Sequence, residues 1–413
     1  MTKLLEDNEL KILKDVVKLP TAPFREELVQ EYALHFAREH GLGARSDRFG
    51  NILLEYRPAA PPQNATLPAL CFTAHMDHPG FEVLAFNEAR NEGEAEFRGG
   101  IRSEFWPGCS LQIYSFEQGS WIEAEGITSL PPRDPERKSF QRFHFSLSKG
   151  KVEPGAIGTF DVPFCQVRGE QLHTKSADDP AQVALVLAWL AQLKREKVPV
   201  HAMGLLTRAE EVGFVGASGA LESGLMPEEE VPVIVLECSK ALPGLAEIGK
   251  GPVLRVGDAG TVYDPDVDAW MLGAAKKLWT KERGGDPEAP PDVERLKRNE
   301  TGEEFKYQRA LMTGGVCEAG LFTLVRRRVG ALALPLGNYH NIGEGSKPQP
   351  APEIISLADC AHQLRLMTTL ASEPFTGMKD GPLRGRLQGV YEQHVERLAG
   401  NEYAKAHVDA RPG

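Results

Sequence analysis

Four short apolar runs in the sequence lead, directly or through a short loop, into histidines or carboxylates. The runs are residues 69–74, 202–207, 233–236 and 331–336, and the polar residues after them are His75, Glu210 with Glu211, Glu237 and His340. A site made of imidazole nitrogens and carboxylate oxygens, with no thiolate, suits a Zn, Co or Mn ion better than it suits a structural zinc ion of the thiolate-bound kind. The pattern therefore predicts a metal centre, since the alternative requires a separate coincidence at the end of every run.

The apolar runs also predict the architecture that would gather these side chains. Continuous apolar stretches of this length are typical of strands buried on both faces, and open α/β sheets collect ligands at the carboxyl ends of such strands. Helical patterns over residues 180–194 and 316–328 fit crossover helices between the strands. We therefore expect an α/β fold with a mixed central sheet and helices on both faces.

His75 and Asp77 form the first candidate element. Residues two apart at a strand end point to the same side. The Asp77 carboxylate can therefore orient the His75 ring through its second nitrogen, as carboxylates commonly do for metal-bound histidines. A structural or surface pair is the alternative interpretation, and it is the commoner one for an isolated His-x-Asp.

Asp178 and Asp179 precede Pro180 and an apolar helical pattern. Asp179 fits the N-cap of that helix, with Pro180 at its first position. This interpretation leaves Asp178 unexplained, and a carboxylate there could bridge two metal ions through its two oxygens.

Glu210 and Glu211 are adjacent carboxylates, and their repulsion costs stability unless a positive charge lies between them. A solvated acidic pair is the alternative, but the apolar flanking residues are not those of a solvated surface. One carboxylate could ligate a metal while its neighbour accepts a proton. Taken alone, Glu237 could simply reach solvent and His340 could be structural. Two divalent cations would offset the charge of the predicted cluster Asp178, Glu211 and Glu237.

Length and changes in composition predict two domains, because 413 residues exceed one simple core. Short β-like pieces between Gly- and Pro-containing turns predict an inserted β-rich domain over residues 79–167. It would divide a discontinuous catalytic domain into residues 1–78 and 168–413. The charged, Pro- and Gly-rich stretch 280–304 predicts a long surface excursion.

Composition and charge restrict the class of protein. The net charge of −11 argues against nucleic acid or an anionic membrane as the main partner. No apolar run approaches the roughly 20 residues of a membrane span, and the charged N-terminus does not fit a signal peptide. The six scattered cysteines lack CxxC-type spacing and so predict neither a disulfide framework nor a thiolate zinc site. We expect a cytoplasmic protein.

In their order, the motifs resemble those of the tetrahedral (TET-type) and glutamyl aminopeptidases, a family of co-catalytic dinuclear zinc metallopeptidases. The matching pieces span about residues 10–370 and are Asp47-Arg-Phe-Gly-Asn51, Ala74-His-Met-Asp77 with Gly80-Phe81, Asp178-Asp179, residues 207–217, Glu237, Gly249-Lys-Gly-Pro252, Gly314-Gly315 and His340. The Glu-Glu-Val-Gly-Phe-Val-Gly-Ala element that begins at Glu210 is the most specific of them.

This resemblance implies a metal-dependent aminopeptidase that hydrolyses N-terminal peptide bonds with a water activated by two divalent ions, Zn or else Co or Mn. Glu210 would be the general base and Asp77 would orient His75. The implied ligands are His75 and Glu237 on one ion, Glu211 and His340 on the other, and Asp178 as the bridge. The family also implies peptide substrates with a free N-terminus and a homo-oligomer assembled through the inserted domain.

The chain departs from the family pattern in ways that bear on substrate preference and assembly. His78 stands where the family usually has an acid, Pro180 where it has Arg, and Glu237 where it has Asp. The family's Gly-Gly-Thr-Asp-Ala appears as Gly-Gly-Val-Cys-Glu-Ala over residues 314–319.

Two rival functions follow from the same residues. One is a related dinuclear metal amidase, deacylase or carboxypeptidase-type hydrolase. The other is a catalytically dead relative that acts as a binding or scaffold protein, which we disfavour because neither the base nor any ligand is missing.

Overall fold

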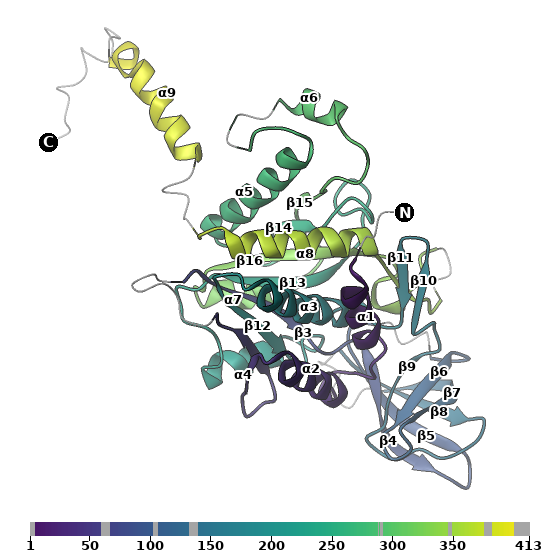
Figure 1. Ribbon diagram of the computed structural model, residues 1–413. Coiled ribbons are helices and arrows are strands. Elements are labelled where there is room, and N and C mark those ends of the chain that lie inside the picture. The colour runs from purple at the N-terminus through teal and green to yellow at the C-terminus, as the bar shows by residue number, and fades with distance from the viewer. Residues whose placement is uncertain are drawn as a thin grey trace, which may run out of the picture.

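The computed structural model describes residues 5–58, 67–101, 106–131, 139–287, 289, 292–345, 349–375 and 382–399. These residues form an eight-stranded mixed sheet, a three-stranded sheet and a closed barrel, with helices on both faces of the large sheet (Figure 1). The predicted α/β class with an added β-rich part is confirmed.

The described helices are α1 (Asp7–Val16), α2 (Glu27–His40), α3 (Pro180–Glu196), α4 (Val215–Ser223), α5 (Pro265–Glu282), α6 (Val293–Arg298), α7 (Glu318–Leu324), α8 (Leu357–Ser372) and α9 (Pro382–Ala399). The strands of the large sheet are β1 (Gly43–Ser46), β2 (Ile52–Tyr56), β3 (Ala69–His75), β12 (His201–Thr207), β13 (Val233–Lys240), β14 (Val253–Gly257), β15 (Gln308–Leu311) and β16 (Val329–Leu336). The three-stranded sheet contains β10 (Cys165–Arg168), β11 (Gln171–Thr174) and β17 (Glu353–Ser356).

The four apolar runs form neighbouring strands in the middle of the large sheet. The strand order is β1-β2-β12-β3-β13-β16-β14-β15, and the four strands β12, β3, β13 and β16 run parallel to one another. Parallel strands place their carboxyl ends along one edge of the sheet. The polar residues that follow the runs are therefore brought to the same edge.

Different helices cover the two faces of this sheet, and consecutive residues of β3 show the division. Leu70 and Phe72 pack in the core shared with α1, α2, α3, α5 and α8, whereas Cys71 packs with α4 and α7. Helix α3 is buried on almost all sides because it lies against the sheet and also contacts α1 and α8.

Helix α7 is shorter than the helical pattern over residues 316–328 predicted. It ends at Leu324, and Arg326 adopts a left-handed backbone conformation with φ of 60°. A left-handed residue just past the last turn terminates a helix. The chain then enters β16 at Val329.

The stretch 280–304 is not an irregular excursion throughout. Helix α5 continues to Glu282, and α6 covers Val293–Arg298. Asp292 caps α6, because its side chain accepts a hydrogen bond from the Arg295 amide at 3.1 Å. The high content of charge, Pro and Gly concealed a helix too short to show a clear period.

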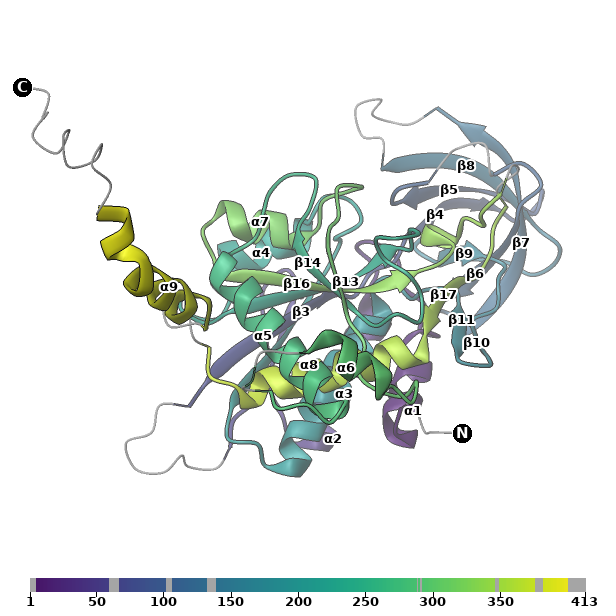
Figure 2. The same ribbon diagram turned by 90° about the horizontal axis from the view of Figure 1, so that it is seen from above.

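The barrel is built from β4 (Gly80–Asn87), β5 (Glu92–Arg98), β6 (Ser110–Ser115), β7 (Ser120–Leu130), β8 (Phe140–Leu147) and β9 (Ile157–Phe160). It has its own core, in which Trp106 and Phe143 stack with ring centroids 4.3 Å apart. Residues 79–167, predicted as an insertion, include all of these strands and also the first three residues of β10, which ends at Arg168 and pairs with β11 outside the barrel. Figure 2 shows the barrel at one end of the large sheet.

Helix α9 lies apart from the large sheet in both views (Figures 1 and 2). Of the helices that the structure describes, none combines the length and apolar character needed to cross a membrane.

Candidate metal centre

The predicted ligands converge where the central strands end. Three overlapping groups have potential ligand atoms within 4.8 Å of one another: His75, Asp178, Asp179 and Glu237; His75, Glu210 and Glu211; and Asp178, Glu211 and His340. His75 ends β3, Glu237 lies in β13, the two glutamates follow β12, and His340 lies in the turn after β16. These positions follow directly from the parallel order of the four strands.

Asp178 lies between the two histidines. Its Oδ1 is 3.4 Å from His75 Nε2, and its Oδ2 is 3.8 Å from His340 Nε2. On the first side, His75 Nε2 is 3.8 Å from Glu237 Oε1. On the other side, His340 Nε2 is 3.4 Å from Glu211 Oε2. The cluster thus has two halves that share one carboxylate.

Several potential ligand atoms in this cluster are buried without a hydrogen-bond partner among the residues that the structure describes. They are His75 Nε2, His340 Nε2, Asp178 Oδ1 and Glu211 Oε1. An unpaired buried polar atom costs about 1–3 kcal/mol, and more when the group is charged. Divalent cations would satisfy all four atoms, so the donor set fits the predicted metals.

The electrostatics of the cluster also favour added positive charge. Burial raises the pKa of Asp178, and the nearby Glu237 raises it further. Burial likewise raises the pKa of Glu211, with added repulsion from Asp178 and Glu210. Burial lowers the pKa of His340 to about 4, which leaves its ring neutral, as a metal ligand must be.

We expect metal removal to destabilise the protein more at higher pH. In the metal-free protein the pKa values of Asp178, Glu210 and Glu211 are raised, by burial first. Groups with raised pKa stabilise the fold below their unfolded pKa of about 4, and that stability is lost as pH rises through the folded-state pKa. The increase in Tm on adding Zn to chelator-treated protein should therefore grow from about pH 5 to pH 8. An increase that is constant or falls over this range would contradict the expectation.

Asp77 contacts both the His75 ring, as predicted, and the loop that carries the two glutamates. The His75 ring nitrogen Nδ1 donates to the main-chain carbonyl of Asp77 at 3.1 Å, while the nearest carboxylate oxygen is 3.5 Å away. The carboxylate also accepts hydrogen bonds from the Glu210 amide at 3.0 Å and the Glu211 amide at 3.1 Å. Asp77 therefore joins the first ligand to the loop that carries the two glutamates.

Asp179 takes the predicted N-cap position of α3, with Pro180 in its first turn, but its side chain makes no capping hydrogen bond. Its Oδ2 accepts from the His75 amide at 3.3 Å, and its Oδ1 has no partner in the described part of the chain. The carboxylate turns towards the metal cluster, where it has a potential ligand atom within 4.8 Å of those of His75, Asp178 and Glu237.

The Asp47–Asn51 motif also fixes the loop that carries Glu210 and Glu211. Asp47 accepts a hydrogen bond from the Asn51 side-chain nitrogen at 2.7 Å. The same nitrogen also donates to the Gly216 carbonyl at 2.9 Å. The Asn51 side-chain oxygen accepts from the Arg208 amide at 3.1 Å. One asparagine side chain therefore holds both ends of the loop.

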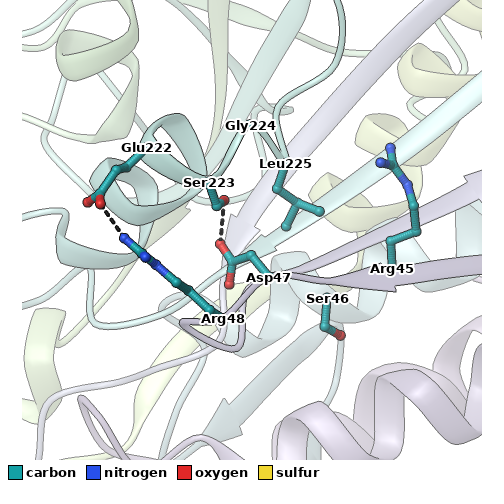
Figure 3. A pocket seen from close by; sticks show the side chains of 8 residues that line it. All are labelled: Arg45, Ser46, Asp47, Arg48, Glu222, Ser223, Gly224 and Leu225. Carbon is teal, nitrogen blue, oxygen red and sulfur yellow. Dashed lines mark hydrogen bonds and ion pairs between the residues drawn. The ribbon is translucent and has the colours of Figure 1, made fainter.

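A pocket of about 520 Å³ lies beside this motif, and none of its lining residues belongs to the metal cluster. Figure 3 shows two contacts inside it: the Ser223 hydroxyl donates to Asp47 at 3.0 Å, and Arg48 pairs with Glu222. These contacts tie the end of α4 to the motif, and we assign the pocket no catalytic role.

His340 depends on the barrel for the orientation of its ring. Its Nδ1 donates to the main-chain carbonyl of Gly100, 3.0 Å away, in the segment that follows β5. This bond places the hydrogen on Nδ1 and leaves the Nε2 lone pair for a metal. The sequence carried no signal for this contact, since it involves a backbone carbonyl of the inserted segment.

We expect Gly100→Val to weaken the half of the site that contains His340. A Cβ at Gly100 would lie 3.4 Å from the His340 ring, so alanine fits, but the methyl groups of valine would displace the imidazole. Disturbing the supports of a ligand typically costs 10–100-fold in metal affinity. Titration calorimetry should show this loss for one ion in Gly100→Val and nearly normal binding in Gly100→Ala. Equal affinities in the two variants would contradict the role of this contact.

Other polar residues beside the centre were missed or noted only as departures. The His78 ring donates from Nδ1 to the Asp178 carbonyl, and its Nε2 is 3.0 Å from the Asn341 side-chain oxygen, so it links the two ligand segments. Glu318 is buried at the start of α7 and accepts from the Thr73 hydroxyl at 3.4 Å. Burial raises the pKa of Glu318 to about 7.

The sequence model of a protein family, described as M42 glutamyl aminopeptidase, matches residues 146–280 of the chain. This segment includes Asp178, Glu210, Glu211 and Glu237. The first and last predicted ligands, His75 and His340, lie outside it.

Several solved structures share the fold. Aminopeptidase APDkam598 from the archaeon Desulfurococcus kamchatkensis is 19% identical with a TM-score of 0.65, over 88% of this chain and 94% of that one. The TET1 peptidase of Pyrococcus horikoshii is also 19% identical with a TM-score of 0.65, over 88% of this chain and 99% of that one. A TET aminopeptidase from the marine sediment archaeon Thaumarchaeota archaeon SCGC AB-539-E09 is 17% identical with a TM-score of 0.66, over 89% of this chain and 96% of that one.

These comparisons confirm the resemblance that the motifs predicted. The solved structures show the fold, while the sequence match bears on the chemistry. The chain is similar to the M42 glutamyl aminopeptidases in the sequence of residues 146–280 and has the fold of the TET aminopeptidases, and this family match indicates a peptide-bond hydrolase of the metal-dependent aminopeptidase class.

Proposed function

We propose that the protein removes residues from the free N-terminus of peptides with two divalent metal ions. His75 and Glu237 would hold one ion, Glu211 and His340 the other, and Asp178 would bridge them. The observation that carries this proposal is that the two oxygens of Asp178 face two different histidines. A carboxylate shared between two nitrogen and oxygen donor sets is what a two-metal hydrolase requires.

The donor atoms suit Zn, with Co or Mn as alternatives, because they are imidazole nitrogens and carboxylate oxygens. When bound, two such ions would polarise the scissile carbonyl and lower the pKa of a water molecule towards neutrality.

Glu210 is positioned to handle the proton of that water. Its Oε2 is 3.9 Å from His75 Nε2, so the carboxylate lies beside the first half of the site. The Asp77 carboxylate fixes its main chain, and burial raises the pKa of Glu210, which suits a general base near neutral pH. Glu210 would accept the proton at its carboxylate and then donate it to the amine that leaves.

We further propose that the protein works as a cytoplasmic homo-oligomer. The TET1 peptidase of Pyrococcus horikoshii can assemble into a tetrahedron or a large octahedral shell. The barrel, with its own core, is the part through which we expect assembly. All six cysteines are free thiols, as is usual in a reducing compartment.

The proposed reaction can be tested by a substrate screen of chelator-treated protein reloaded with Zn, Co or Mn. Aminoacyl-anilides should be cleaved, and the same compounds with an acylated amine should not. Hydrolysis of N-acylated amino acids in place of aminoacyl-anilides would refute the aminopeptidase assignment and favour a deacylase with the same metal pair.

A further inference from the structure

Glu353 is a buried carboxylate that contacts the main chain of both ligand segments. It begins β17 and is fully buried. Its Oε2 accepts from the amides of Ala177 at 2.7 Å and Asp178 at 3.1 Å, while its Oε1 accepts from the His340 amide at 2.9 Å. One side chain thus joins the bridging residue to the last ligand, which is distant in the sequence.

The segment around His340 needs such an anchor. His340 and its neighbours Asn338 and Asn341 all have φ between 53° and 59°, in the left-handed region. Non-glycine residues persist in this conformation only when their surroundings hold them there. The hydrogen bond from the His340 amide to Glu353 constrains the turn at the ligand itself.

The position of Glu353 is fixed by the three-stranded sheet. In β17 it pairs with Thr174 of β11, and β11 leads into the segment that carries Asp178. Helix α8 follows β17 without a gap. The carboxylate therefore sits on a strand between the turn that carries Asp178 and the short 3-10 turn, Tyr339–Asn341, that carries His340.

We propose that Glu353 is a positioning residue that sets the placement of His340 relative to Asp178, and with it the affinity for the ion between Glu211 and His340. This inference rests on the metal roles proposed above. An ionised carboxylate offers only acceptors, and the three groups that donate hydrogen bonds to it here are main-chain amides, while the His78 ring nitrogen Nδ1 lies 3.8 Å from its Oε2. Glutamine would place its side-chain amide NH2 group, itself a donor, against at least one of these main-chain amides, so Glu353→Gln should displace either Asp178 or His340.

The matched control is Asp359, another buried carboxylate that accepts main-chain hydrogen bonds. It accepts from the amides of Gly249 and Gly251, both at 2.7 Å, and contacts neither ligand segment in the described residues. Asp359→Asn should therefore lower stability without changing metal binding. Comparing the two variants separates a specific effect on the metal site from general loss of a buried acceptor.

The test is metal stoichiometry and affinity, measured by elemental analysis and titration calorimetry with Zn on the full chain. We expect the wild-type protein and Asp359→Asn to bind two ions, while Glu353→Gln loses 10–100-fold in affinity for one of them. The metal concentration for half-maximal activity of Glu353→Gln should rise by the same factor, with kcat recovering at saturation. Glu353→Asp, which keeps the acceptors on a shorter side chain, should show a smaller loss, and it decides the question if Glu353→Gln does not fold.

Wild-type affinity for both ions in a folded Glu353→Gln or Glu353→Asp would overturn the proposal, as would an equal loss in Asp359→Asn. A wild-type protein that binds fewer than two ions would instead overturn the proposed two-metal function, and this inference with it.

Discussion

Replacement of Glu210 by glutamine should lower kcat by about 10²–10⁴-fold, the contribution typical of a general base. Both ions should remain bound, because Glu210 is not among the residues assigned as ligands and its main chain is held by Asp77. Glutamine keeps the shape of the side chain but cannot accept the proton of the attacking water. Steady-state kinetics on an aminoacyl-anilide, with metal content measured on the same sample, would test this.

Glu222→Gln provides the matched control for this experiment, since Glu222 is exposed on α4 and pairs with Arg48 at the surface. It should retain full activity. Near-normal turnover in Glu210→Gln would remove Glu210 from the mechanism. Loss of metal from Glu210→Gln would make it a ligand and not the base.

Replacement of Asp178 by alanine should have the largest effect on metal content. Because Asp178 faces both histidines, its loss removes a ligand from each half of the site at once. We expect the affinity for each ion to fall by more than about 100-fold, the upper end of the loss seen when only a supporting residue is changed. Activity should fall to background under the same metal concentration.

Variants that lack one of the two histidines should each lose metal from one half of the site. His75→Ala and His340→Ala should each lose one ion, and each should keep weak binding of the other. His362→Ala is the control, because His362 is buried but lies outside the cluster and accepts a hydrogen bond from the Lys306 amide. Full occupancy by two ions in both His75→Ala and His340→Ala would refute the ligand assignment.

The central strands could be predicted because burial on both faces leaves a direct mark on the sequence. A strand covered on both sides must be apolar at every position, so β3, β12, β13 and β16 stand out as runs. Glu210 and Glu211 follow from the same logic, since they lie just past the end of β12, whereas Glu237 lies inside β13, which continues to Lys240. The apolar runs are therefore sufficient to locate His75, Glu237 and the two glutamates along the chain.

The predictions were less accurate where one residue has two possible partners. Asp179 matches an N-cap in sequence, yet its carboxylate turns to the His75 amide. Asp77 matches a support for the His75 ring, and its carboxylate lies 3.5 Å from the ring nitrogen Nδ1, but the same carboxylate also accepts hydrogen bonds from the Glu210 and Glu211 amides, which the spacing did not predict. Local spacing shows that a polar group is present, but its partner depends on which distant segment packs beside it.

Residue types and their spacing along the chain therefore predict the donor groups of the centre, which are two histidines and several carboxylates near strand ends. The residue types do not predict the contacts that hold these donor groups in place. The Gly100 carbonyl against His340, and the Glu353 carboxylate between His340 and Asp178, join segments that are far apart in sequence. Such contacts are made by main-chain groups that every residue possesses, so they leave no compositional signal and arise only when the barrel, β17 and the sheet pack together.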